Sequence, residues 1–183
     1  MTDPSTESPG LRVGMFMPGL RPDALGWHAH LDFARQVEAL GLQCQVLTTG
    51  QSPGPTEPHE GQIRILADSP FPWERLGALL APLLRNRRVL PAAAALARYL
   101  RAEGSSVDVL HVEVAYPHGI AAALARRMSG WSGQIVLTPM GEDTLVLEQS
   151  SYGFRRYPLP RRLIEWVLRE AAVLRCISPM LEE

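Results

Sequence analysis

The stretch VDVLHVEVAYPHGIAAALARRM, residues 107–128, indicates the fold of this chain. Its first part, 107–114, is an apolar run with the length of a strand. Its last part, 118–128, is rich in alanine and has the length of a helix. Helices cover both faces of a parallel sheet, so a strand inside such a sheet is apolar almost throughout. The stretch therefore predicts one strand-to-helix unit of an α/β fold.

The same alternation continues in both directions. Further strands are expected at residues 11–17, 43–48, 62–67, 134–138 and 172–177. Helices are expected before Gly41, where apolar residues recur every three positions, between residues 73 and 103 with a break near 85–91, and along 163–171. Parallel strands need long right-handed connections, which helices supply. The fold class is therefore α/β, a Rossmann-like parallel sheet flanked by helices.

Length and composition narrow the possible functions. The 183 residues fit one domain at 11–183 after a disordered tail at 1–10, and the net charge of −1 gives no electrostatic footprint for nucleic acid. All basic residues are arginine, which indicates a GC-rich, bacterial source and excludes Schiff-base and P-loop lysine chemistry. Cys44 and Cys176 lie far apart and are expected to be reduced, as in the cytoplasm. No signal peptide or membrane-spanning segment is expected.

Ligands of open α/β sheets bind beyond the carboxyl ends of the strands, where the strand order reverses. The loop at 18–28 contains Gly19, Gly26 and His28, and its backbone N–H groups could approach an anion. Its spacing is not that of a dinucleotide-binding fingerprint, so a nicotinamide oxidoreductase is disfavoured. Gly26 could also be a simple turn residue.

Two further loops bring polar side chains to the same edge of the sheet. After the strand at 107–114 come Tyr116 and His118, and Glu113 lies nearer this edge than His111, which is expected to be a hydrogen-bonded core residue. After the strand at 134–138 comes a loop that sets two carboxylates beside Gly141, and either Glu142 or Asp143 could orient a sugar hydroxyl or act as a base. Asp143 could instead cap a helix.

Other sites have less support in the sequence. His28 and His30 lack the spacing of a zinc pair, so no metal is expected, and no nucleophile elbow of a hydrolase occurs. A basic and aromatic segment at 154–166 contains Arg155, Arg156, Arg161 and Arg162. It could contact an anionic membrane surface at the periphery, it could hold a phosphorylated acceptor, or it could be a solvated helix face.

Taken in order, these motifs resemble the N-terminal domain of GT-B glycosyltransferases of family 4, which are retaining and use nucleotide sugars. The central strand of that family, Asp-x-x-His-x-His, is matched by Asp108, His111 and Glu113, and its Thr-x-His-Gly-x-Asp loop by residues 138–143. The opening loop and the helix that follows it are matched by residues 18–48. Two family histidines are replaced, by Glu113 and by Met140.

The resemblance implies a role for each loop. Gly19, Gly26 and His28 would lie at the donor diphosphate, Glu113, His118 and Asp143 would be catalytic, and the acceptor would contact Tyr116, Gly141 and Glu142. No cofactor is implied, because the nucleotide sugar is a substrate. The expected partners are the nucleotide sugar, an acceptor sugar or lipid, and a C-terminal domain that holds the donor.

The family's donor domain contains two glutamates separated by seven positions, and these 183 residues hold no such pair. The chain is therefore expected to be the acceptor-side half of a hexosyltransferase, inactive without the other half. The alternative is a non-catalytic sugar-binding or regulatory module that retains half of the GT-B fold.

Overall fold

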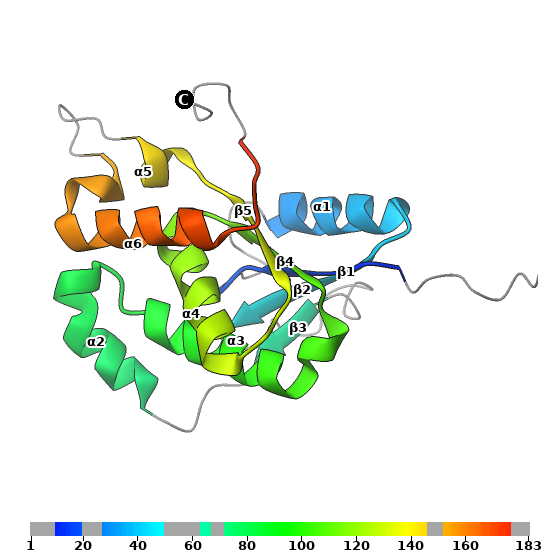
Figure 1. Ribbon diagram of the computed structural model, residues 1–183, viewed down its shortest axis with the longest axis horizontal. Helices are drawn as coiled ribbons and strands as arrows, with labels where there is room; N and C mark the ends of the chain where they lie inside the picture. The colour runs from blue at the N-terminus through cyan, green and yellow to red at the C-terminus, as the bar shows by residue number, and fades with distance from the viewer. Residues whose placement is uncertain (1–9, 20–26, 50–62, 67–71, 146–151, 177–183) are drawn as a thin grey trace, which may run out of the picture.

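The computed structural model describes residues 10–19, 27–49, 63–66, 72–145 and 152–176 (Figure 1). Its strands are β1 (Arg12–Phe16), β2 (Gln43–Thr49), β3 (Ile63–Leu66), β4 (Val109–Glu113), β5 (Gln134–Thr138) and β6 (Val173–Leu174). Its helices are α1 (Trp27–Ala39), α2 (Trp73–Leu84), α3 (Val89–Glu103), α4 (Ile120–Ser129), α5 (Gly141–Thr144) and α6 (Pro158–Glu170). Strands and helices thus alternate as the sequence predicts.

The six strands form one parallel sheet in the order β3-β2-β1-β4-β5-β6. The chain builds outward from β1 to β3, returns through α2 and α3, and continues on the other side of β1 with β4. Residues Val13 to Phe16 of β1 therefore pair with Val109 to Val112 of β4. This confirms the α/β, Rossmann-like fold class and places the reversal of strand order between β1 and β4.

Helices cover the sheet on both sides. Figure 1 shows α1 on one side and α2, α3 and α4 on the other, with α6 packed against α4. The buried faces of α3 and α4 are largely alanine, as in the run Ala92–Ala95 and in Ala121–Ala123. Small side chains let the two helix axes approach closely, which explains why these alanine-rich segments are the most intimately packed helices.

The core lies between the sheet and this helical layer. Leu110, Val112, Ile135 and Leu137 of the two central strands are fully buried. Burying each side chain of this size stabilises the fold by roughly 1.5–3 kcal/mol. A smaller cluster around Met15 and Leu31 joins α1 to the opposite side of the sheet.

Some element ends differ from the expected ones. The helix expected at 118–128 begins at Ile120, because a π-helical turn, η3 (Ala115–Gly119), precedes it. The strand expected at 172–177 is reduced to two residues at the edge of the sheet. Pro91 lies inside the first turn of α3 rather than at a break, since the N–H that proline lacks has no helical partner in that turn.

Within the described ranges, no helix has the length and hydropathy needed to cross a membrane. Cys44 is buried and Cys176 is half-buried, and the two cysteines do not form a disulfide bond. The expected tail at 1–10 lies outside the described residues except for Gly10.

Candidate functional site

The candidate site is the crevice at the carboxyl ends of β1 and β4. The chain leaves β1 through Gly19, whose backbone N–H donates to the Thr49 carbonyl oxygen at 3.1 Å. Gly19 has a φ of +78°, in the left-handed region that favours glycine. Its conformation turns the chain away from the sheet at the point where the first candidate loop begins.

Glu113 ends β4 and faces a histidine of α1. The Glu113 carboxylate Oε2 lies 3.4 Å from His30 Nδ1, and the two side chains are 16% and 21% exposed. A polar pair with this partial exposure is shielded from water yet still open to a ligand. Glu113 therefore has the position that the sequence predicts, and His30 joins it from a different element.

His118, in the turn after β4, interacts with both residues of this pair. Its environment lowers the pKa of the imidazole, mainly through burial and further through the charge of His30, against a hydrogen bond to the Glu113 backbone that raises it. A lowered pKa keeps the ring neutral near pH 7, so that one ring nitrogen can accept a proton. The structure thus brings His30, Glu113 and His118 together.

His111 is a core residue, as the sequence interpretation holds. Its Nε2 lies 3.0 Å from the Thr138 hydroxyl, and its ring contacts Phe33 of α1 with 5.2 Å between the ring centroids. Burial, with the charges of Arg175 and His30, lowers the pKa of His111 to about 4. The ring is neutral at pH 7 and links α1, β4 and β5.

Asp143 is fully buried and binds backbone rather than solvent. Its carboxylate accepts hydrogen bonds from the N–H groups of Ala115 at 2.6 Å, Tyr116 at 2.9 Å and Met140 at 3.1 Å. Burial raises its pKa to about 6, although the three N–H donors favour the ionised form. The helix-capping interpretation of Asp143 is confirmed, and the same carboxylate also fixes the turn after β4.

Tyr116 is also fully buried, and its ring packs on Phe154 with 4.7 Å between centroids. Its hydroxyl has no hydrogen-bond partner among the described residues, and burial raises its pKa to about 12. In this structure neither Tyr116 nor Asp143 reaches the surface of the crevice. The expectation that these side chains contact the acceptor or reacting atoms is therefore corrected to a supporting position beneath the site.

The turn between β4 and α4 carries backbone strain. Val114 has a φ of +72°, which is rare for a β-branched residue, and its N–H donates to the Thr138 carbonyl oxygen at 2.9 Å. Such strain persists only where surrounding contacts enforce it, and it is concentrated at functional sites. Here it sets the direction in which the chain leaves Glu113.

The third loop lies beside β5. Glu142 is exposed, and Gly141 is half-buried under Tyr152, whose hydroxyl would be 3.2 Å from a Cβ added at Gly141. Any larger residue at Gly141 would have to displace that hydroxyl. Both residues thus border the crevice side of the sheet, as expected, while Gly26 and the His28 side chain lie outside the described residues.

Two residues at the site were not identified from the sequence. His30 was considered only as half of a zinc pair, although its place one turn into a helix after the glycine loop was the available signal. Arg88, which precedes α3, brings Nη1 to 3.4 Å from the position of a Cβ on Gly19. The basic run at 85–88 was interpreted only as a break between helices.

A cavity of about 480 Å³ lies at the other end of the sheet, where Arg12 and Asp108 line it. Arg12 donates to both carboxylate oxygens of Asp108, at 2.9 and 2.7 Å, and this pairing lowers the pKa of Asp108 to about 2. Asp108 therefore joins β1 to β4 at their amino ends. No group of three or more potential metal ligands occurs in the described ranges.

Comparison with known proteins gives one family. Residues 26–183 match the family described as glycosyl transferase 4-like domain, which covers the described part of the chain from α1 onward. No match was found among curated proteins. With its six-stranded parallel sheet and the motifs of its loops in family order, the chain belongs to the glycosyl transferase 4-like domain family and is a glycosyltransferase domain.

Proposed function

We propose that this domain forms the acceptor side of a retaining hexosyltransferase that takes its sugar from a nucleotide sugar. One observation carries the proposal: the half-buried Glu113 carboxylate faces His30 at the reversal of strand order. A carboxylate at this position can orient an acceptor hydroxyl and accept its proton. The acceptor would be a sugar, a lipid or a small molecule.

In the transfer step, the anomeric carbon loses its bond to the diphosphate oxygen and gains a bond to the acceptor oxygen on the same face of the sugar ring, so that its configuration is retained. The acceptor proton passes to Glu113, while His118 and the exposed Glu142 hold the acceptor. The diphosphate is the leaving group, and it takes up negative charge as its bond to the anomeric carbon breaks. Backbone N–H groups of the Gly19 to Gly26 loop, with His28, would stabilise that charge, as preorganised donors do in a site shielded from water.

Arg88 adds a cation on this side of the site. Its guanidinium lies beside Gly19, and no ion pair with an acidic residue is found for it among the described residues. A guanidinium presents several N–H donors in a fixed plane and suits phosphate oxygens. We assign Arg88 to the donor diphosphate, with Gly19.

Asp143 and Tyr116 act as positioning residues in this proposal. Asp143 holds the N–H groups of Ala115 and Tyr116, and these follow directly after the strained Val114. The direction of the Glu113 side chain depends on this turn. Asp143 thus affects transfer through Glu113 rather than by contact with substrate.

The proposal is tested by assaying the complete protein from its source with a panel of nucleotide sugars and acceptors, with product detection by mass spectrometry. Glu113→Gln keeps the size and removes the charge, and we expect it to lower the transfer rate by about 10²–10⁴-fold. Glu103→Gln, an equally conservative change of an exposed carboxylate at the end of α3, should leave most of the rate. Undiminished transfer in Glu113→Gln would refute the role of Glu113.

The second candidate function, a non-catalytic sugar-binding or regulatory module, is favoured by one observation. Glu113 and Met140 stand where the family motif has histidines. If the complete protein binds an acceptor sugar but transfers nothing from any donor, this second function replaces the first.

A further inference from the structure

Helix α2 exposes apolar side chains on its outward face, where a surface helix normally has polar ones. Its inner side is fixed by Gly77, which is buried against Arg87 and Pro91. The side of the helix opposite Gly77 carries Leu79 and Leu83, which are 74% and 61% exposed. A surface helix normally turns charged or polar residues to that side. Two leucines exposed there indicate that the face is made to contact something apolar.

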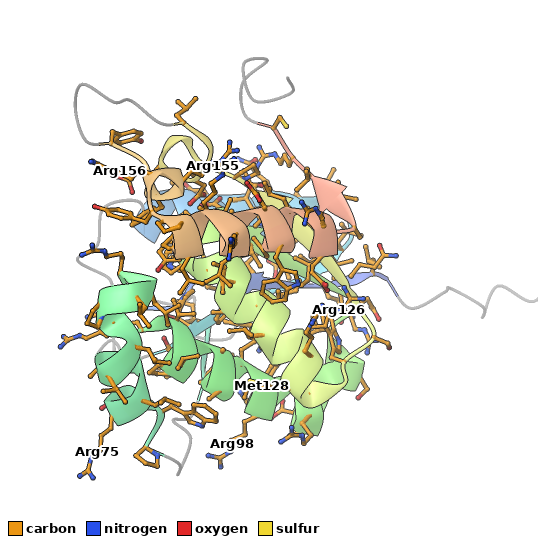
Figure 2. All side chains as sticks on the ribbon, turned by 60° about the vertical axis from the view of Figure 1, so that its left-hand side comes forward. Arg75, Arg98, Arg126, Met128, Arg155 and Arg156 are labelled. Carbon is orange, nitrogen blue, oxygen red and sulfur yellow. The ribbon has the colours of Figure 1, made fainter. Side chains whose placement is uncertain are left out.

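The exposed leucines are surrounded by positive charge. The segments 72–88 and 152–165, which comprise α2 with its C-terminal loop and the start of α6, contain eight arginines, two glutamates and no aspartate, although the net charge of the whole chain is −1. Figure 2 shows Arg75 projecting from one end of α2, Arg156 above its other end, and Arg155 above α6. The charge is therefore concentrated on one surface and balanced elsewhere.

Contacts between aromatic and basic side chains join the two elements into one surface. The Arg85 guanidinium at the end of α2 lies 4.6 Å from the ring centroid of Tyr157, and that of Arg156 lies 5.5 Å from the same ring. Leu159, the second residue of α6, is 37% exposed beside them. We call this the α2–α6 surface and define it by Leu79, Leu83, Leu159, Arg75, Arg85 and Arg156.

The α2–α6 surface adjoins the crevice. Helices α3 and α6 run antiparallel to the strands, so their first residues lie at the carboxyl ends of the sheet. Arg88 precedes α3, follows α2 by one short loop, and reaches Gly19. A ligand held at the α2–α6 surface would therefore be close to the site.

We propose that the α2–α6 surface docks the domain on the anionic surface of a lipid bilayer, with the leucines in the apolar boundary and the arginines at the headgroups. Leucines surrounded by arginines, with few acidic side chains nearby, match the apolar boundary and the anionic headgroups of such a surface. A soluble protein partner would offer either an apolar groove or an acidic patch. The further consequence, that the acceptor is a lipid or lipid-linked sugar, rests on the proposed function.

The test is sedimentation of the protein with vesicles, which needs no substrate. Vesicles of phosphatidylcholine with phosphatidylglycerol are compared with pure phosphatidylcholine at low and high salt. We expect binding only to the anionic vesicles, weakened by salt because the arginines act through charge. The variant Arg75→Gln/Arg85→Gln/Arg156→Gln should lower partitioning about a hundredfold, because each arginine near the membrane contributes about 1 kcal/mol, or about fivefold.

A second variant separates insertion from charge attraction. Leu79→Ser/Leu83→Ser should lower partitioning at least tenfold without changing the net charge, because each leucine contributes by leaving water. Its matched control is Leu40→Ser, since Leu40 is 77% exposed just after α1 on the other side of the sheet. The control should bind vesicles as the unchanged protein does, and all variants should keep the same circular dichroism spectrum.

Three results would overturn the proposal. They are failure of the unchanged protein to bind anionic vesicles, equal loss in the Leu40 control and the leucine variant, and self-association through Leu79 and Leu83 in sedimentation velocity. Vesicle binding without any transfer reaction would leave the docking surface intact and count against the proposed function alone.

Discussion

At the scale of single residues, the crevice depends on a pair that separate elements bring together. His30 comes from α1 and Glu113 from the end of β4, and their side chains meet at 3.4 Å. A histidine held against a carboxylate fixes the direction of that carboxylate, much as a third group orients a catalytic base. His30 is therefore a positioning residue for Glu113 in the proposed reaction.

We expect His30→Asn to lower kcat of the complete protein about tenfold to a hundredfold and to change the acceptor KM little. Positioning residues act on the reacting geometry more than on ground-state binding. The measurement is steady-state transfer across a range of pH. Asp32→Asn, two residues along the same helix and exposed beside Arg35, is the matched control. Equal rates for the unchanged enzyme and His30→Asn would contradict the assignment.

His111 makes stability depend on pH. Its pKa falls from 6.5 in the unfolded chain to about 4 in the fold, so protonation favours the unfolded chain. The contribution is fully present above pH 6.5 and is lost as the pH falls toward 4, by about 3 kcal/mol. Asp143, with its pKa raised to about 6, acts in the opposite direction between pH 6 and 4.

Urea unfolding between pH 7.5 and 4.5 measures this dependence. His111→Gln should be less stable at pH 7.5, because the contacts with Thr138 and Phe33 change, and should lose less free energy of unfolding on acidification. Parallel pH curves for the two proteins would show that another group titrates.

At the scale of elements, the turn after β4 is held by one side chain from the next loop. Asp143→Asn leaves at least one of the three backbone N–H groups without its acceptor, and a buried donor left unpaired costs about 1–3 kcal/mol. We expect that loss in the free energy of unfolding by urea. Glu142→Gln, at the exposed neighbouring position, should change it by less than about 0.5 kcal/mol. Similar losses in both variants would argue against the role of Asp143 in holding this turn.

The packing of α2 against the start of α3 depends on a glycine at residue 77. A Cβ at Gly77 would lie 2.2 Å from the Arg87 carbonyl oxygen, so the helix would have to move away from α3. Gly→Ala inside a helix normally stabilises it by up to about 1 kcal/mol. We expect Gly77→Ala to destabilise the domain instead, by about 1–3 kcal/mol. Thermal and urea unfolding would show this, and a gain in stability would contradict the packing described for α2.

At the scale of the whole molecule, the reversal of strand order assembles the site from distant segments. The Gly19 loop follows β1, Arg88 precedes α3, and Glu113 ends β4. Gly19, Arg88 and Glu113 lie at the same edge of the sheet because β4 pairs with β1 rather than with β3. In the proposed function, the diphosphate would also need cations from a second domain, in the same polypeptide or on another chain.

We expect this 183-residue chain alone to transfer no sugar and the complete assembly from the source cell to do so. Capture with an antibody against the domain, followed by intact mass, distinguishes the two arrangements. A mass near twice 20.2 kDa would place both domains in one polypeptide, and a mass of 20.2 kDa would direct the search to a partner chain. Sugar transfer by this chain alone would contradict the proposal.

The sequence by itself determined the class of fold and most of its elements. Apolar runs such as that of β4 and the alanine-rich α4 are local patterns, so periodicity alone identifies them. The order of the loops also led to the family, and the positions of Glu113 and His118 followed from the direction of one strand. The core position of His111 was predictable because its neighbours in the strand are apolar.

Only the tertiary structure decided which side chains meet. His30 reaches Glu113, and Arg88 reaches Gly19, because the sheet order brings α1 and α3 to one edge, and no local pattern contains that order. Burial likewise separated Glu113 from Asp143 and Tyr116, which follow similar strands in sequence but lie under the site. Whether a polar group contacts substrate or supports the backbone depends on long-range packing, and a sequence pattern does not record it.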